Sequence, residues 1–158
     1  KDNEDALLLL VGPNSNVEEE RKKKKKIKRE SKKKDIEQNI IFTDTVDNVE
    51  EYMKASDLFV FPTRREGFGT VIVEAMSTSL PVITLKNPGI TEYIIENGQE
   101  GLVLEKEDPE LFTETIRKIL ANERLSKKIG KRARERVKEK FDVSVVDKQY
   151  LNLYNSIQ

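Results

Sequence analysis

The sequence predicts an α/β fold in which a doubly wound parallel sheet carries helices on both faces and extra helices follow at the C-terminal end. Short continuous apolar runs alternate with helical patterns through the first two thirds of the chain. After Leu104 the apolar runs cease and only helical periodicity continues. Strands separated by helices pair in parallel, which fixes the fold class.

The expected strands are apolar runs without polar alternation, at residues 6–11, 40–43, 58–62, 81–85 and 101–104. Such runs are typical of strands that are buried on both faces of a parallel sheet. The first run stops at Gly12-Pro13, which indicates a turn. In a sheet of this kind ligands bind outside the carboxyl ends of the strands, so the loops that follow these runs are the places to look for a site.

The C-terminal helices are predicted from capping and periodicity. Asp108 before Pro109 is an N-cap with proline at the first helical position. Three apolar stripes then follow at helical spacing, and we expect them to pack against the sheet. Their members are Phe112, Ile116, Ile119 and Leu120; Leu125, Ile129, Ala133, Val137 and Phe141; and Val146, Tyr150, Leu153, Tyr154 and Ile157.

The composition restricts the chemistry. A chain of 158 residues predicts a single domain, 1–158, and its formal net charge of zero argues for no particular polyelectrolyte partner. There is no cysteine and no histidine, which excludes disulfides, thiolate nucleophiles, imidazole bases and the usual zinc sites. Acid, base and metal chemistry would therefore rest on carboxylates, lysine, tyrosine or the substrate.

The start of the chain and the length of its apolar runs indicate the cellular compartment. No run is long enough to span a bilayer and the start does not resemble a signal peptide, which predicts a cytoplasmic protein. The chain begins with Lys1 close to a buried type of strand. We expect the domain to be incomplete at its N-terminus.

The most informative segment is Glu-Gly-Phe-Gly-Thr-Val-Ile-Val-Glu, from Glu66 to Glu74, directly after the run at 58–62. Gly67 and Gly69 allow a tight turn whose backbone N–H groups face a ligand, and the helix that follows directs its positive end to the same place. Such an arrangement suits a phosphate or a sugar hydroxyl.

This segment and the runs around it resemble the donor-binding, C-terminal domain of family 4 (group 1) glycosyltransferases of the GT-B fold. The resemblance extends in order through Leu-Leu-Leu-Leu-Val-Gly at 7–12, Asp-Leu-Phe-Val-Phe-Pro-Thr at 57–63, Glu-x7-Glu, Pro-Val-Ile at 81–83, Gly-Ile-Thr-Glu-Tyr at 89–93 and Asn-Gly-Gln-Glu-Gly-Leu-Val-Leu at 97–104. It implies a Rossmann-like domain, one half of a GT-B enzyme, that binds a UDP- or GDP-sugar for retaining transfer to a glycan, lipid or other acceptor. It implies no metal and no cofactor, with the nucleoside-diphosphate sugar as substrate.

The resemblance also assigns roles to the two glutamates. Glu74 would accept hydrogen bonds from the ribose hydroxyls, a task that suits a carboxylate; alternatively it is a first-turn acid that stabilises its helix. Glu66 would face the donor sugar close to the reacting centre, as the catalytic residue; alternatively it is a solvated loop acid.

The remaining assignments concern backbone and pocket walls. The backbone of Gly67, Phe68, Gly69, Thr70 and Val71 would hold the sugar and the diphosphate, and we expect the Thr70 hydroxyl to be the N-cap of the helix. The other positions follow the loops of neighbouring strands. Gly12 would lie near the diphosphate or simply end its strand, Val46 would lie near the base, and Pro88 and Gly89 would line the far side of the sugar pocket.

The chain departs from the family in three respects. The family often has glycine near Thr43 or Asp44, and this chain does not. The family's earlier Arg and Lys, which neutralise the departing diphosphate, have no counterpart here, and Arg64 and Arg65 are more typical of rim charges. The N-terminal acceptor domain is missing, so we expect the isolated chain to bind donor without transferring it.

Basic residues concentrate at residues 21–34, from Arg21 to Lys34. This segment is either a solvated helix face or a surface for peripheral contact with an anionic membrane. Nucleic acid is not expected as a partner, because no aromatic residues are interleaved with the charges. Two other functions stay open for the whole chain, a GT-B epimerase or phosphorylase half and a non-catalytic nucleotide-binding or scaffold module.

Overall fold

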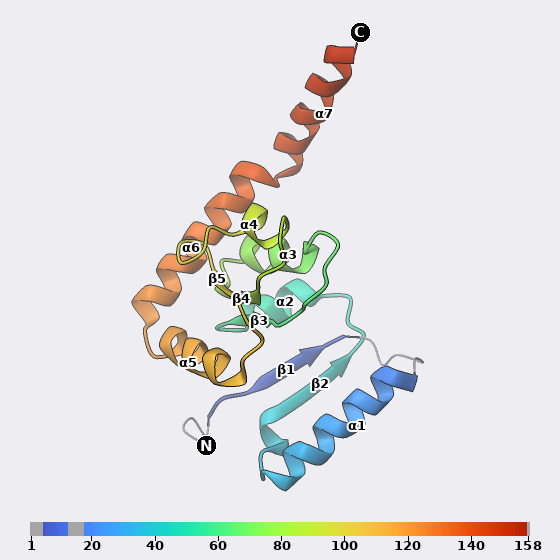
Figure 1. Cartoon of the computed structure of the whole chain (residues 1–158), viewed down its shortest axis with the longest axis vertical. Coiled ribbons are helices and arrows are strands. Elements are labelled where there is room, and N and C mark those ends of the chain that lie inside the picture. The colour runs from blue at the N-terminus through green and yellow to red at the C-terminus, as the bar shows by residue number, and fades with distance from the viewer. Residues whose placement is uncertain (1–4, 13–17, 158) are drawn as a thin grey trace. The chain divides into compact units, whose positions relative to one another are not determined.

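The computed structural model describes residues 5–12 and 18–157, and the chain divides into two compact units, residues 1–49 and 50–158. The first unit contains β1 (Leu8–Val11), α1 (Glu18–Lys33), the short 3-10 helix η1 (Glu37–Asn39) and β2 (Ile40–Asp44) (Figure 1). The second contains α2 (Val49–Lys54, which starts at the boundary), β3 (Phe59–Phe61), α3 (Thr70–Ser77), β4 (Val82–Leu85), α4 (Thr91–Ile94), β5 (Leu102–Leu104), α5 (Pro109–Leu120), α6 (Glu123–Lys140) and α7 (Val143–Ile157). A single domain over 1–158 stays a prediction.

In the first unit β1 and β2 pair in parallel, with Leu8 opposite Ile40, and α1 lies between them in the chain as the crossover helix. The expectation that the run at 6–11 is buried on both faces is wrong: Leu8 is 49% exposed and Val11 is 37% exposed. The reason is that the described residues of this unit form a sheet of two strands, too few to bury both faces of either one.

α1 contacts β2 through its lysines. The ammonium groups of Lys24 and Lys28 lie 5.1 and 5.3 Å from the centre of the Phe42 ring, and Lys24 also pairs with Asp44. Ile27, the one apolar residue at the centre of the helix, is 37% exposed. The contact therefore depends on the aliphatic stems and charges of lysines rather than on an apolar stripe.

The second unit is built on a three-stranded parallel sheet of order β3-β4-β5. Every residue of the central strand β4 is buried. Val82 belongs to a core cluster with Ile72 and Met76 of α3, whereas the next residue, Ile83, belongs to a second cluster with Ile119 of α5. Because successive strand side chains point to opposite faces, the two clusters cover the two faces of the sheet, which confirms the predicted α/β fold with helices on both sides.

The C-terminal helices begin as predicted. The Asp108 carboxylate accepts hydrogen bonds from the backbone N–H groups of Glu110 and Leu111, with Pro109 at the first helical position of α5. In α6, Ile129 and Ala133 are buried as the stripe predicts. Gly130 is buried as well, and a Cβ placed there would lie 2.0 Å from the carbonyl oxygen of Ser79. The turn between α3 and β4 thus lies directly against the backbone of α6.

α7 differs from its prediction. Its apolar face is exposed rather than packed on the sheet, and no residue of this helix is buried. Leu153 is 55% exposed, Tyr154 67% and Ile157 74%. Figure 1 shows α7 extending beyond α6 and away from the sheet of its own unit. The 3.6-residue periodicity predicted the helix correctly, but periodicity alone does not specify what covers a helix face.

α7 begins at a polar cap. The Asp142 carboxylate accepts hydrogen bonds from the hydroxyl and the backbone N–H of Ser144, and these bonds hold the pKa of Asp142 below its ordinary value. Within residues 5–12 and 18–157, none of the helices has the length and apolar character needed to cross a bilayer.

We predict that Gly130→Ala destabilises the second unit by about 2 kcal/mol or more, because the added methyl group collides with the Ser79 carbonyl. Helix propensity alone predicts the opposite, a gain of about 1 kcal/mol. Urea denaturation followed by circular dichroism measures the change. Lys128→Ala, at an exposed position of the same helix, is the control and should shift stability by no more than about 0.5 kcal/mol. Equal stability of Gly130→Ala and the wild type would contradict the tight approach.

Candidate functional site

The Glu66–Glu74 segment forms a loop and the first turns of α3. β3 ends at Phe61, the chain runs through a loop without regular structure, and α3 starts at Thr70. The segment therefore lies at the carboxyl end of β3, where an open α/β sheet binds its ligands.

The two glycines of this loop have different reasons to be glycine. Gly69 has a φ of +86° and is buried, and a Cβ there would lie 3.0 Å from Cδ1 of Ile94. Gly67 is exposed, and a Cβ there would meet nothing within 4 Å. Gly69 is thus required by the fold of the loop, whereas the space beside Gly67 is open to a ligand.

Glu66 is half-buried, and its carboxylate accepts a hydrogen bond from the N–H of Gly67 at 2.8 Å. The acid therefore folds over the loop's own backbone rather than extending into solvent. A backbone donor and a carboxylate thus lie together in the loop that follows β3.

The N-terminus of α3 has no side-chain cap. Its N-cap is Gly69, so the expectation that the Thr70 hydroxyl fills this role is wrong. The first turn also contains no acidic residue. The first backbone N–H groups of a helix have no partner within it, and here neither a capping oxygen nor a carboxylate of the first turn offsets their positive potential.

Glu74 lies on the second turn of α3 and is exposed. The alternative in which it is a first-turn acid is therefore wrong. Glu74 borders an open, mainly apolar hollow of about 440 Å³, whose other lining residues are Phe68, Thr70, Val73, Ser77, Phe141 and Val146. A carboxylate at the rim of an apolar hollow fits a ligand with both a hydroxyl-bearing and a flat apolar part.

An aromatic cluster supports the loop from the C-terminal side. The Phe141 ring, at the end of α6, makes edge-to-face contacts with Phe68 at 6.0 Å and with Tyr93 at 5.7 Å between ring centres. Phe68 therefore connects the glycine loop to the end of α6. Its side chain is still 47% exposed. Sequence analysis assigned Phe141 only to a helix stripe and missed this contact.

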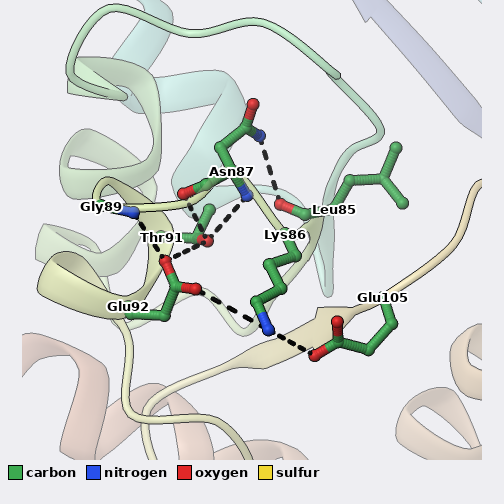
Figure 2. A network of polar contacts seen from close by, with 7 residues as sticks. All are labelled: Leu85, Lys86, Asn87, Gly89, Thr91, Glu92 and Glu105. Carbon is green, nitrogen blue, oxygen red and sulfur yellow. Dashed lines mark hydrogen bonds and ion pairs between the residues drawn. The ribbon is translucent and has the colours of Figure 1, made fainter.

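Pro88 and Gly89, the predicted far side of the sugar pocket, lie in the turn between β4 and α4. Figure 2 shows the polar network that holds this turn. The buried Thr91 accepts a hydrogen bond from the backbone N–H of Asn87 and donates to the Asn87 carbonyl, at 3.0 and 3.2 Å. The Asn87 amide donates to the carbonyl of Thr63, 3.0 Å away in the loop that leads to Glu66. The two loops of neighbouring strands are thus directly linked.

Gly12 and Val46 belong to the first unit, where they follow the carboxyl ends of β1 and β2. The N–H of Gly12 donates to the Asp44 carbonyl at 3.3 Å, and a Cβ at Gly12 would meet nothing. Asp44 has a φ of +58°, a conformation that glycine adopts most readily. The chain therefore keeps at Asp44 the backbone shape that glycine would favour, and aspartate tolerates it better than most residues.

Arg136 is a structural residue of the site that the sequence did not reveal. Its guanidinium donates to the carbonyls of Ile94 and Tyr93 at the end of α4, at 2.6 and 2.9 Å, and lies 3.8 Å from the Glu100 carboxylate. Both side chains are largely buried. The partners are some forty positions upstream in the chain, so no local pattern could have predicted the contact. Of the predicted rim charges, Arg64 pairs with Glu107.

The described residues contain no group of three or more acidic side chains that could hold a metal ion. The expectation that the chain needs no metal stays a prediction.

Comparisons with known proteins place this geometry in context. The family model "Glycosyl transferases group 1" matches residues 1–136. The chain is 33% identical over 153 residues to the N-acetyl-alpha-D-glucosaminyl L-malate synthase of Bacillus anthracis, covering 97% of this chain and 38% of that protein. It is 34% identical over 118 residues to the capsular polysaccharide biosynthesis glycosyltransferase CapM of Staphylococcus aureus, covering 75% of this chain and 31% of that one.

Among solved structures, HepE of Anabaena in complex with UDP superposes with a TM-score of 0.86 at 24% identity, over 96% of this chain and 41% of that one. Sucrose-phosphate synthase of Thermosynechococcus elongatus superposes with a TM-score of 0.83 at 26% identity, over 95% of this chain and 38% of that one. These likenesses confirm the α/β fold. The chain spans between 31 and 41% of the length of these four relatives.

We predict that Gly69→Ala destabilises the chain by about 1–2 kcal/mol, because a side chain at a left-handed φ is strained and its methyl group would press on Ile94. Gly67→Ala is the matched control and should change stability by no more than about 0.5 kcal/mol, since its Cβ enters open space. Thermal and urea denaturation of both variants give the comparison. Equal effects of the two substitutions would contradict the distinction between a glycine that the fold requires and one whose Cβ would enter open space.

Proposed function

The chain belongs to the glycosyl transferases of group 1, which have the GT-B fold, and on that premise we propose that it binds the nucleoside-diphosphate sugar donor of a glycosyltransferase. The observation that carries the proposal is the loop at the carboxyl end of β3, where the exposed Gly67 donates its N–H to the Glu66 carboxylate shortly before the uncapped N-terminus of α3. Backbone donors at a helix start are well suited to bind a diphosphate.

UDP is the nucleotide we favour, with GDP second. The support comes from the similar HepE structures, which were determined with UDP and with UDP-glucose. In this chain Glu74 would accept the ribose hydroxyls at the rim of the hollow that it borders, and the apolar lining would contact the flat parts of the nucleotide. The sugar itself stays open, because sugars differ by single hydrogen bonds.

The chemistry we propose is retaining transfer without a metal. Negative charge builds on the departing phosphate oxygens, and backbone N–H groups from Gly67 to Val71, together with the helix end, stabilise it where it develops. Glu66 faces the sugar near the reacting carbon once its bond to the Gly67 amide is exchanged for ligand contacts. Pro88 and Gly89 would form the far wall of the sugar site.

We further propose that the chain is the C-terminal, donor-binding half of a family 4 enzyme that acts in the cytoplasm. Transfer needs an acceptor held in register and water excluded, and a donor half alone supplies neither. The chain alone should therefore bind donor and release no sugar to an acceptor. The second candidate is a scaffold module of the same fold in which the site is not used.

We predict that one of the nucleotides UDP, GDP and ADP binds the folded chain saturably, and that Glu74→Ala weakens this binding at least about tenfold because a charge-assisted hydrogen bond to the ribose is lost. Isothermal titration measures both affinities. Glu114→Ala, an exposed acid on α5, is the control and should bind as the wild type does. Binding of none of the three nucleotides by a folded chain would contradict the proposal and favour the scaffold module.

A separate proposal concerns α1. Lys22 and Lys23 pair with Glu18 and Glu19 and are at least 70% exposed, and Lys25 and Lys26 are exposed beside them. We propose that these charges allow peripheral contact with an anionic membrane surface, each basic residue near the surface contributing about 1 kcal/mol.

Cosedimentation with vesicles of phosphatidylserine and phosphatidylcholine tests this contact. We predict binding at 0.1 M salt, loss of binding at 0.5 M salt by screening, and weaker binding for Lys25→Glu/Lys26→Glu. Lys128→Glu/Lys131→Glu in α6 makes the same charge change elsewhere and should bind as the wild type does. Absence of binding at low salt, or binding that both double variants retain, would identify α1 as a solvated helix only.

A further inference from the structure

The turn after β4 is held by a network of polar contacts whose tip is Gly89 (Figure 2). Gly89 has a φ of +79°, and a Cβ there would meet nothing within 4 Å, so its shape comes from hydrogen bonds rather than from packing. At the base of the turn, Asn87 and Thr91 are buried and bonded to each other. These bonds fix the base, and the N–H of Ile90 closes the turn by donating to the Asn87 carbonyl at 3.0 Å. None of them takes the N–H of Gly89 itself.

Glu92 is the residue that reaches the tip. Its Oε2 atom accepts the N–H of Gly89 at 3.1 Å. Its other carboxylate oxygen faces the Lys86 ammonium at 3.9 Å, and Lys86 lies 3.1 Å from the Glu105 carboxylate at the end of β5. Glu92 thus connects the Gly89 backbone to Lys86 and, through Lys86, to Glu105; these two residues directly follow β4 and β5.

The tip also lies beside the Glu66 loop. β3 and β4 are neighbouring parallel strands, so the loops that follow them leave the same edge of the sheet. The Asn87 amide bonds the Thr63 carbonyl at 3.0 Å and joins the two loops at their bases. A ligand held by Glu66 and the Gly67 amide would have the Pro88–Gly89 tip as its neighbouring wall.

We infer that Glu92 is a positioning residue for the sugar end of the donor, an inference that rests on the proposed function. It acts through the Gly89 backbone and does not itself touch the ligand, because its carboxylate is turned to Gly89 N–H and Lys86. The nucleotide end is assigned to Glu74 and the α3 amides. Loss of Glu92 therefore weakens the contact with the sugar and leaves the contact with the nucleotide unchanged.

Parallel NMR titrations of the chain with UDP and with UDP-glucose test this inference. In Glu92→Ala we expect UDP-glucose to bind about three- to tenfold more weakly, the range for one lost hydrogen bond to a charged group in a partly exposed setting, while UDP affinity changes less than about twofold. Glu92→Gln should restore most of the UDP-glucose affinity, because an amide oxygen accepts the same Gly89 N–H. Glu105→Gln removes only the outer partner of Lys86 and should bind both ligands as the wild type does.

Hydrogen exchange at the Gly89 amide is measured on the same samples, without ligand. It should be faster in Glu92→Ala and near the wild-type rate in Glu92→Gln. A merely stabilising role of Glu92 would lower both affinities together or neither.

Failure of the proposed donor site and failure of the inference about Glu92 give different results. A wild type that binds neither UDP nor UDP-glucose rejects the donor site, and the inference with it. A wild type that binds both, with a ratio of affinities unchanged in Glu92→Ala, rejects only the inference. Unchanged exchange at Gly89 in Glu92→Ala also rejects it, since Glu92 would then not hold the tip.

Discussion

The parallel pairing of β4 with β3 on one side and β5 on the other is the constraint on which the second unit depends. It buries every residue of β4 and divides the core into two clusters by the alternation of its side chains. Parallel pairing also directs the carboxyl ends of all three strands to one edge. The loops that contain Glu66 and Gly89 become neighbours for that reason, although more than twenty residues separate them in the chain.

Two close backbone approaches then set the positions of the helices relative to this sheet. Gly130 lets α6 approach the turn that precedes β4, and Gly69 lets the Glu66 loop enter α3 against Ile94. Arg136, whose side chain is largely buried, completes the arrangement by bonding the end of α4 to α6. A rigid support of this kind matters for a backbone-donor site, because amides bind an anion well only when they already point in the required direction.

Much of the fold could be predicted from the sequence, because buried parallel strands and capped helices leave local signals. The apolar runs at 58–62 and 81–85 became β3 and β4, and Asp108-Pro109 began α5 as expected. The failures involve partners that are distant in the chain. The exposure of β1 and of α7 depends on how many elements surround them, and no local pattern reports this number.

The site was predicted less completely, for a similar reason. The Glu66–Glu74 segment predicted the loop and the helix correctly. The N-cap is Gly69 rather than Thr70, an error of one position, and the exact ends of helices are the least predictable part of an element. Glu92 belongs to the Gly-Ile-Thr-Glu-Tyr motif at 89–93, but the motif did not show that its carboxylate accepts the Gly89 N–H and faces Lys86. A residue that contacts a ligand often belongs to a sequence motif, whereas the contacts by which another residue orients it are seen only in the three-dimensional structure.

The hydrogen bond between the Glu66 carboxylate and the Gly67 N–H gives the proposed site a further property. With the loop in this state, the half-buried acid and the amide of the exposed Gly67 satisfy each other. Under the proposed function, a phosphate or hydroxyl oxygen that takes the Gly67 N–H releases Glu66 to accept a hydroxyl of the sugar. The two contacts then form together, and a ligand that offers only one of them leaves the other group to water. A donor that carries both a diphosphate and a sugar is favoured over either part alone by this exchange.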